Sequence, residues 1–233
     1  MKKLIITIII LLTASTSFAV YPTEYLAGRA THFYEDDDFI SGLTTTGNIG
    51  KQGWVFDGTP TVTTSPLSSS THPGALRFST PASSSNVTLC LKVCNATTGI
   101  WDIAGDFDTT VIVTTLNWAT SLTYIGYFMG DVVPTINYIG IQGRPASNNW
   151  MFLATGASIT NSGVAIVDGT WYKLRIKKTG TSVEFYINDE YKATLTTTAT
   201  GQAQPYFLVN TGNTTVKSLD IDYWSLTIPS LAR

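Results

Sequence analysis

Polar and apolar residues alternate strictly in the segment from Trp171 to Lys177. The apolar side comprises Tyr172, Leu174 and Ile176, and the polar side comprises Lys173, Arg175 and Lys177. A period of two is typical of an antiparallel β-strand with one buried face. Gly180 interrupts the pattern, and we predict a turn there because glycine adopts a positive φ without steric cost.

A second alternating strand is predicted after this turn. Its inward residues are Val183, Phe185 and Ile187, and its outward residues are Glu184 and Tyr186. A turn at 188–190 then leads into a third strand near Tyr191. Glu184 can lie opposite the basic side of the first strand, where an exposed cross-strand pair contributes roughly 0.2–1 kcal/mol. The segment from Val167 to Leu195 therefore predicts a β-meander.

The rest of the chain shows the same short apolar segments, separated by turn residues. Predicted strands cover Trp54–Phe56, Ala75–Ser79, Asn86–Val93, Asp108–Leu116, Thr123–Met129, Tyr138–Gln142, Asn149–Thr155, Tyr206–Asn210 and Lys217–Ile228. We find no helical segment of four turns after the N-terminal run. Many short strands with turn signals between them predict an all-β fold, an antiparallel two-sheet β-sandwich or jelly roll.

The last predicted strand also alternates. Its pattern places Leu219, Ile221 and Tyr223 inward and Asp220, Asp222 and Trp224 outward.

The N-terminus has the pattern of a secretory signal peptide. Lys2 and Lys3 precede an apolar run from Leu4 to Leu12, and small residues lead to Ala19. This run is too short for a good transmembrane span, and an uncleaved N-terminal anchor is the alternative. We therefore predict a signal peptide at 1–19, one domain at 20–233, and a secreted, extracellular or cell-surface location.

Composition supports an extracellular location and argues against a nucleic-acid partner. Loss of Lys2 and Lys3 changes the formal net charge from -2 to -4, and charged residues make up only 13% of the chain. A mildly acidic chain lacks the basic surface that nucleic acid requires.

Cys90 and Cys94 would lie roughly 13 Å apart in an extended strand. They can form a disulfide only if the chain turns or bulges between them.

Glu35–Asp38 is an acidic cluster, which is either a solvated turn or part of a calcium site with ligands from distant loops. We expect no cofactor, with structural calcium as the alternative.

Several motifs resemble the concanavalin A-like lectin/glucanase domains. Residues 168–176 and 183–188 resemble the central hairpin of that fold, and residues 217–223 resemble its closing strand. Other pieces resemble a subgroup found in bacteriophage tail and fibre proteins, at 38–42, 50–54, 72–77 and 149–150. The resemblance implies a jelly roll with one concave sheet, in a lectin, a glycan-active enzyme or a surface or virion domain. A signal peptide is unusual in a virion protein and favours a secreted or cell-surface protein.

The sequence favours binding over catalysis. Glycosidases use two carboxylates, and the laminarinase-like enzymes of this fold carry them as Glu-x-Asp-x-x-Glu on one strand. The Glu residues of this chain do not occur in that pattern; they are Glu24, Glu35, Glu184 and Glu190. Lyases of this fold use Gln, His, Tyr and Arg, and Tyr138, Gln142 and Arg144 match this set without a His.

Glycan binding requires aromatic rings that stack on sugars and planar polar groups that read hydroxyls. We expect Trp54 and Trp171 to be core residues, and Trp118 and Trp150 to be exposed platforms. The alternative is that both of the latter cap the ends of the core. The candidate ligand-binding residues are Trp118, Tyr138, Arg144, Asn148, Asn149 and Trp150.

The sequence thus predicts a non-catalytic extracellular domain that binds a glycan or polysaccharide, and oligomerisation is compatible with it. The alternatives are a structural virion or cell-surface decoration protein without a sugar site, and a glycan hydrolase or lyase.

Overall fold

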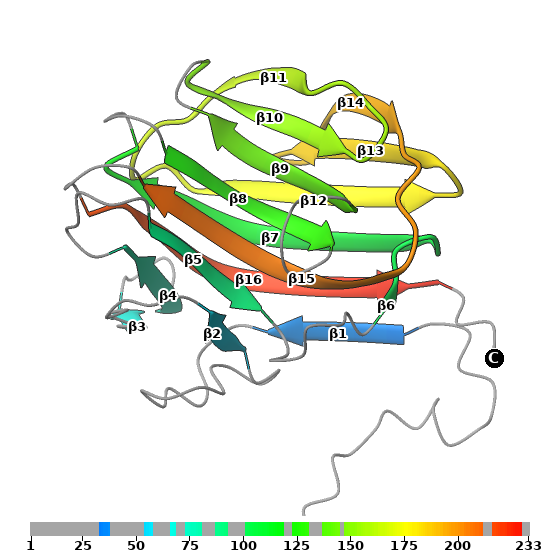
Figure 1. The fold of residues 1–233 in the computed structure, drawn as a ribbon. Helices are drawn as coiled ribbons and strands as arrows, with labels where there is room; N and C mark the ends of the chain where they lie inside the picture. The colour runs from blue at the N-terminus through cyan, green and yellow to red at the C-terminus, as the bar shows by residue number, and fades with distance from the viewer. Residues whose placement is uncertain are drawn as a thin grey trace, which may run out of the picture. The chain divides into compact units, whose positions relative to one another are not determined.

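The structure is a computed structural model that describes residues 33–37, 54–57, 66–68, 73–80, 87–92, 101–118, 123–130, 137–144, 147–211 and 216–229. All of them belong to one compact unit, His32–Arg233. Every regular element in these ranges is a β-strand (Figure 1). No helix long and apolar enough to cross a membrane is found among them. The predicted signal peptide lies outside the described residues.

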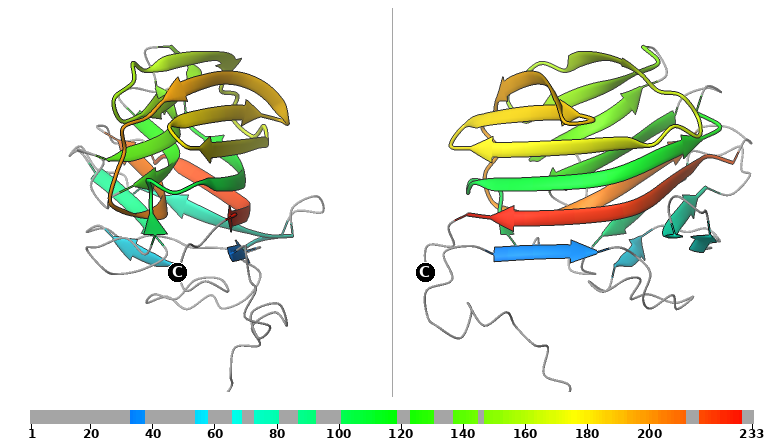
Figure 2. Two further views of the ribbon diagram at one scale, coloured as in Figure 1. Left: turned by 90° about the vertical axis from the view of Figure 1, so that its right-hand side faces the viewer. Right: turned by 180° about the vertical axis from the view of Figure 1, so that it is seen from behind.

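The strands form two antiparallel sheets, which Figures 1 and 2 show as facing layers. The first sheet has the order β14 (Glu190–Thr196), β13 (Ser182–Ile187), β12 (Tyr172–Thr179), β7 (Phe107–Leu116), β16 (Ser218–Ile228), β4 (Pro73–Ser79) and β3 (Pro66–Ser68), and β1 (Phe33–Asp37) also pairs with β16. The second has the order β11 (Thr160–Ala165), β10 (Asn149–Ala154), β9 (Tyr138–Arg144), β8 (Thr123–Gly130), β15 (Gln202–Thr211), β5 (Val87–Lys92) and β2 (Val55–Asp57), and β6 (Trp101–Asp102) pairs with β15. The predicted all-β, two-sheet sandwich is confirmed.

The predicted meander forms β12, β13 and β14. Lys177 lies opposite Glu184, as the alternation predicted, and Gly180 in the turn has a φ of 58°. The other side of β12 pairs with β7, so β12 is an interior strand of the first sheet.

The core lies between the two sheets and is rich in aromatic side chains. Trp54 is fully buried, as predicted, and it packs on Phe207 at 5.3 Å and edge-on to Trp224 at 5.1 Å between ring centroids. Trp171 precedes β12 and is only half-buried, so its predicted place in the core is wrong.

The inward position of Trp224 corrects a second prediction. Ile221 lies opposite Val113 and Tyr223 opposite Ile112, so Asp222 is an extra residue in β16. This β-bulge reverses the alternation beyond it, because each residue after the bulge turns to the other face of the sheet. Trp224 is therefore buried instead of exposed, and Tyr223 is only half-buried.

A polar cluster joins the two sheets inside the core. The Tyr127 hydroxyl of β8 accepts a hydrogen bond of 2.7 Å from Trp224 Nε1 of β16. It also lies 2.6 Å from Thr109 Oγ1 of β7, which donates to the carbonyl of Ser225 at 2.7 Å. Because the threonine proton is used in that bond, Tyr127 donates to Thr109. Burial raises the pKa of Tyr127, so the phenol stays protonated and can keep donating.

We expect Tyr127→Phe to lower the free energy of unfolding by about 1–3 kcal/mol, because the buried Trp224 Nε1 would lose its acceptor. Chemical denaturation of both proteins measures the difference. Tyr191→Phe is the matched control, since it removes the hydroxyl of an exposed tyrosine and should change stability by less than about 0.5 kcal/mol. Equal effects of the two substitutions would contradict the role of Tyr127.

Candidate functional site

The outer face of the second sheet contains part of the predicted site. Ile139 and Ile141 of β9 point into the core, so the alternate residues of this strand point away from it. These alternate residues are Tyr138, Gly140, Gln142 and Arg144. The structure therefore places two of the predicted ligand-binding residues, Tyr138 and Arg144, on one face together with Gln142. Tyr138 and Arg144 nevertheless lie at opposite ends of the strand, about 20 Å apart at ~3.3 Å per residue.

A small cluster of aromatic side chains covers the middle of this face. Phe128 stacks on Tyr206, with 5.1 Å between ring centroids and 13° between planes, and meets Tyr138 edge-on. A Cβ on Gly140 would lie 2.2 Å from Phe128 Cδ1, and one on Gly126 would lie 2.7 Å from Cε2. Phe128 therefore lies flat against the backbone of β8 and β9. It is only 2% exposed, so this cluster offers no open platform for a sugar.

Trp118 and Trp150 are not exposed platforms, and that prediction is wrong. They are 1% and 0% exposed, because both indoles point into the core. Trp150 meets Tyr172 edge-on at 5.5 Å. Trp118 lies over Gly143, where an added Cβ would come within 2.7 Å of its Cη2 atom. Both residues instead belong to the hydrophobic core.

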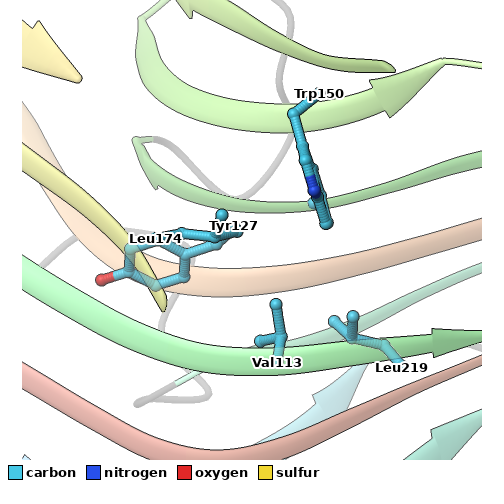
Figure 3. A pocket seen from close by; sticks show the side chains of 6 residues that line it. Val113, Tyr127, Trp150, Leu174 and Leu219 are labelled. Carbon is cyan, nitrogen blue, oxygen red and sulfur yellow. The ribbon is translucent and has the colours of Figure 1, made fainter. Parts of the chain in front are cut away.

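The space next to Trp150 is an interstice between the sheets, not a ligand pocket. Figure 3 shows its lining, which includes Val113, Tyr127 and Leu174. It has no room for a water molecule. The Trp150 Nε1 atom is buried and makes no hydrogen bond with any residue that the structure describes.

Trp118 instead organises a group of loops at one end of the sandwich. Its backbone N–H donates to both carboxylate oxygens of Asp168 at 3.0 Å. The side chain of the preceding Asn117 donates to the Val216 carbonyl at 3.0 Å, and Lys217 Nζ donates to the Asn117 carbonyl. Burial of Lys217 lowers its pKa. The loops after β7, after β11 and before β16 are thus tied together.

The same indole holds Asn148, which lies in the turn before β10. Trp118 Nε1 donates to Asn148 Oδ1 at 2.7 Å. The Asn148 backbone N–H donates to the Arg144 carbonyl at 3.0 Å, and its carbonyl accepts from Ile166 N at 2.9 Å. Asn148 is exposed and has a φ of 52°. With three of its groups bound to protein, its amide presents the two N–H donors of Nδ2 to solvent.

Asn148 belongs to a polar surface that we call the amide patch, which comprises Arg144, Asn148, Asn149 and Asn161. Asn149 lies opposite Arg144 across β9 and β10, and its Nδ2 donates to Asn161 Oδ1 at 3.1 Å. The structure thus brings together Arg144, Asn148 and Asn149 from the predicted set. Asn161 was missed because β11, with its small polar residues, has no strand signal. The one local sequence signal at Asn161 is the turn-forming triplet Asn-Ser-Gly. In this turn the Asn161 Oδ1 atom accepts a hydrogen bond of 2.8 Å from the Gly163 backbone N–H.

The strands around the patch contain no acidic residue. Neither Asp nor Glu occurs in β8, β9, β10 or β15, and the nearest acidic strand positions of this sheet are on β2 and β6. The described part of these strands therefore offers hydrogen-bond donors and acceptors but no pair of carboxylates.

The metal and disulfide predictions are not decided by the described residues. These residues contain no group of three or more His, Cys, Asp or Glu side chains that could hold a metal ion. The side chains of Asp36 and Asp37 and all of Asp38 lie outside the description, as does Cys94, so the acidic cluster and the disulfide stay predictions.

Comparison with known proteins identifies the fold but no family. No protein-family model and no curated protein sequence matches the chain. A similar solved structure is a GlcNAcα1-4Gal-releasing endo-β-galactosidase from Clostridium perfringens (TM-score 0.58, 10% identity, 86% of this chain and 64% of that one). Another is the carbohydrate recognition domain of Emp47p (TM-score 0.54, 10% identity, 83% and 94%). A third is a sialidase (TM-score 0.54, 10% identity, 82% and 18%).

These likenesses show a jelly-roll sandwich, in agreement with the fold predicted from the sequence. The chain spans less than two thirds of the length of the galactosidase and under a fifth of the sialidase. The narrower resemblance to bacteriophage tail and fibre domains stays a prediction.

We expect Gly140→Ala to reduce stability by about 1–3 kcal/mol, because the new methyl group would push the Phe128 ring off the sheet. Thermal or chemical unfolding measures the change. Gly105→Ala is the control substitution. A Cβ added at Gly105 has more space than one at Gly140, since its nearest neighbouring atom is 3.3 Å away. A neutral effect of Gly140→Ala would show that Phe128 is not held in this position.

Proposed function

We propose that this protein is a non-catalytic, extracellular carbohydrate-binding protein, and that the amide patch contacts the glycan. The observation that carries the proposal is the fixed amide of Asn148. Its oxygen faces the buried Trp118 indole, and its two donors face solvent. A polar group that is already oriented loses little conformational entropy when a ligand binds.

The neighbouring side chains complement the hydroxyl groups of a sugar, which both donate and accept. Asn148 supplies donors, while Asn149 uses Nδ2 to bind Asn161 and so offers Oδ1 as an acceptor. Arg144 lies opposite Asn149 and adds a planar guanidinium, which is a hydrogen-bond donor. The two amides therefore offer both the donors and the acceptors that sugar hydroxyls require.

The absence of acidic residues from β8, β9, β10 and β15 favours binding over glycoside hydrolysis at the amide patch, because hydrolysis needs two carboxylates. The similar structures named above carry carbohydrate recognition or carbohydrate-cleaving activity in their names, which supports a glycan ligand in general. The location outside the cell rests on the predicted signal peptide.

The test is a glycan array probed with the wild-type protein and with Asn148→Asp. Aspartate keeps an oxygen for the Trp118 indole but removes both outward donors. We expect binding at least about 10-fold weaker, equivalent to ~1.4 kcal/mol, with an unchanged melting temperature.

Asn188→Asp is the matched control, because Asn188 is also exposed with a positive φ of 54° but lies in the turn after β13. It should leave binding unchanged. Equal losses in both variants, or full binding by Asn148→Asp, would contradict the proposal. A blank array with a folded protein would favour the decoration protein without a sugar site.

A further inference from the structure

The outer face of the first sheet carries an exposed aromatic ring that the amide patch does not use. Tyr191 at the start of β14 is 54% exposed, and among the described aromatic side chains it is the one that falls in the exposed class. It lies opposite Tyr186 of β13. This tyrosine pair is on the opposite side of the sandwich from the amide patch.

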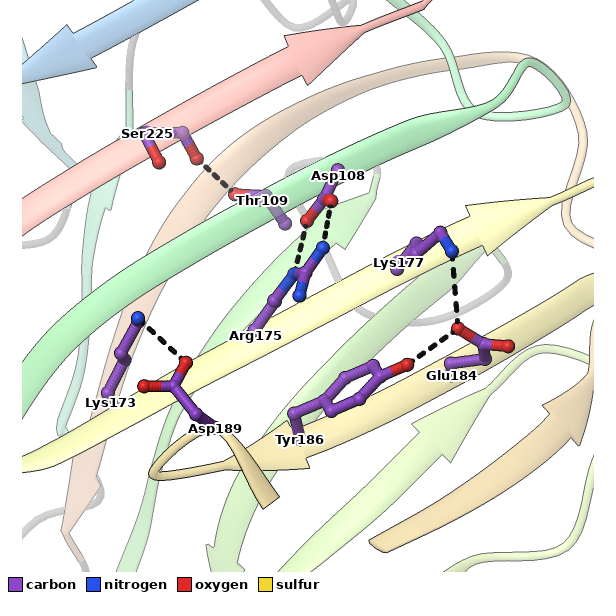
Figure 4. A network of polar contacts seen from close by, with 9 residues as sticks. All are labelled: Asp108, Thr109, Lys173, Arg175, Lys177, Glu184, Tyr186, Asp189 and Ser225. Atoms are coloured by element: carbon purple, nitrogen blue, oxygen red, sulfur yellow. Dashed lines mark hydrogen bonds and ion pairs between the residues drawn. The ribbon is translucent and has the colours of Figure 1, made fainter. Parts of the chain in front are cut away.

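Both rings are held in place by the protein. The Tyr191 hydroxyl lies 3.0 Å from Thr194 Oγ1, and its ring meets Tyr186 edge-on with 5.8 Å between centroids. Tyr186 donates to Glu184 at 2.8 Å, and the Arg175 guanidinium lies 5.2 Å from its centroid (Figure 4). A ring with restricted rotamers loses little further entropy when a ligand stacks on it.

The charges around the tyrosines neutralise one another. Figure 4 shows three ion pairs, with atoms 2.7 Å apart for Lys173–Asp189, 2.5 Å for Arg175–Asp108 and 3.6 Å for Lys177–Glu184. Three cations thus face three carboxylates, and Lys192 pairs with Glu190 at 2.7 Å on either side of Tyr191. The charges next to the two tyrosines therefore balance and favour neither a polyanion nor a polycation.

The same ion pairs make a glycan a more favourable ligand than a protein at this surface. A protein interface would remove three ion pairs from water, and the desolvation cost of buried ion pairs often matches or exceeds their attraction. A glycan leaves such groups hydrated, because its hydroxyls and bridging waters hydrogen-bond to them. The apolar face of a pyranose meanwhile covers the exposed ring.

We propose that the outer face of the first sheet is a second glycan-contact surface, on which a neutral pyranose stacks on Tyr191. This inference rests on the proposed function and specifies a ligand class for a separate site. Because the two sites lie on opposite faces, one molecule can hold two glycan chains, and binding to a polymer gains affinity from both contacts.

The test is an amide NMR titration of the protein with laminarihexaose, cellohexaose and mannohexaose, with hexagalacturonate as an anionic comparison. At least one neutral probe should shift the signals of Tyr191 and Thr194. The affinity should be the same at low and high salt, since no net charge contributes. Tyr191→Ala should weaken this binding at least tenfold, while Tyr191→Phe, which keeps the ring, should retain it.

Asn148→Asp separates the two proposals, because it should abolish the shifts at the amide patch and leave those at Tyr191 intact. Shifts at the amide patch alone would overturn the second site and leave the proposed function standing. Shifts at Tyr191 alone would overturn the amide patch as a contact site but leave carbohydrate binding and the second site standing. No shift at either place would contradict both proposals for these glycans. A change of oligomeric state in Tyr191→Ala, seen by sedimentation, would show a protein interface and overturn the second site.

Discussion

The two sheets can bury their apolar faces only against each other, and this leaves the Tyr127 hydroxyl without access to water. Its hydrogen bonds to Trp224 and Thr109 satisfy the phenol and the indole together. Apolar contacts alone would tolerate small shifts of one sheet over the other, whereas these bonds hold only when β8 faces β7 and β16 in one alignment. The bulge at Asp222 is part of the same constraint, since it turns the Trp224 indole inward to reach Tyr127.

The buried tryptophans cannot stack on a ligand, but Trp118 holds surface residues in position. Trp118 closes the end of the core and uses its two N–H groups on Asp168 and Asn148, so one core residue fastens a loop and orients an exposed amide. The outer faces of the sheets then differ in chemistry. The amide patch presents uncharged amides beside one arginine, whereas the tyrosine pair is surrounded by paired charges.

Sequence patterns located the strands well where the alternation was regular and the residues were β-branched or aromatic. The meander, β7 to β10, and β15 and β16 were all located. β11 was missed because Thr160–Ala165 is small and polar, and β3 lies within a segment that reads as a serine-rich loop. Of the residues predicted to bind a ligand, the structure brings Arg144, Asn148 and Asn149 together, whereas Trp118 and Trp150 are buried instead of exposed.

Periodicity by itself determined the fold class and the faces of β12 and β13, because a period of two follows from local backbone geometry alone. The tertiary structure decided the orientation of Trp118, Trp150 and Trp224. A tryptophan after a turn or a bulge points inward or outward according to which residue the partner strand places opposite it, and that register involves segments far apart in the chain. Trp118 and Asn148 are 30 residues apart, so their hydrogen bond exists only once β7 and the turn before β10 have packed together.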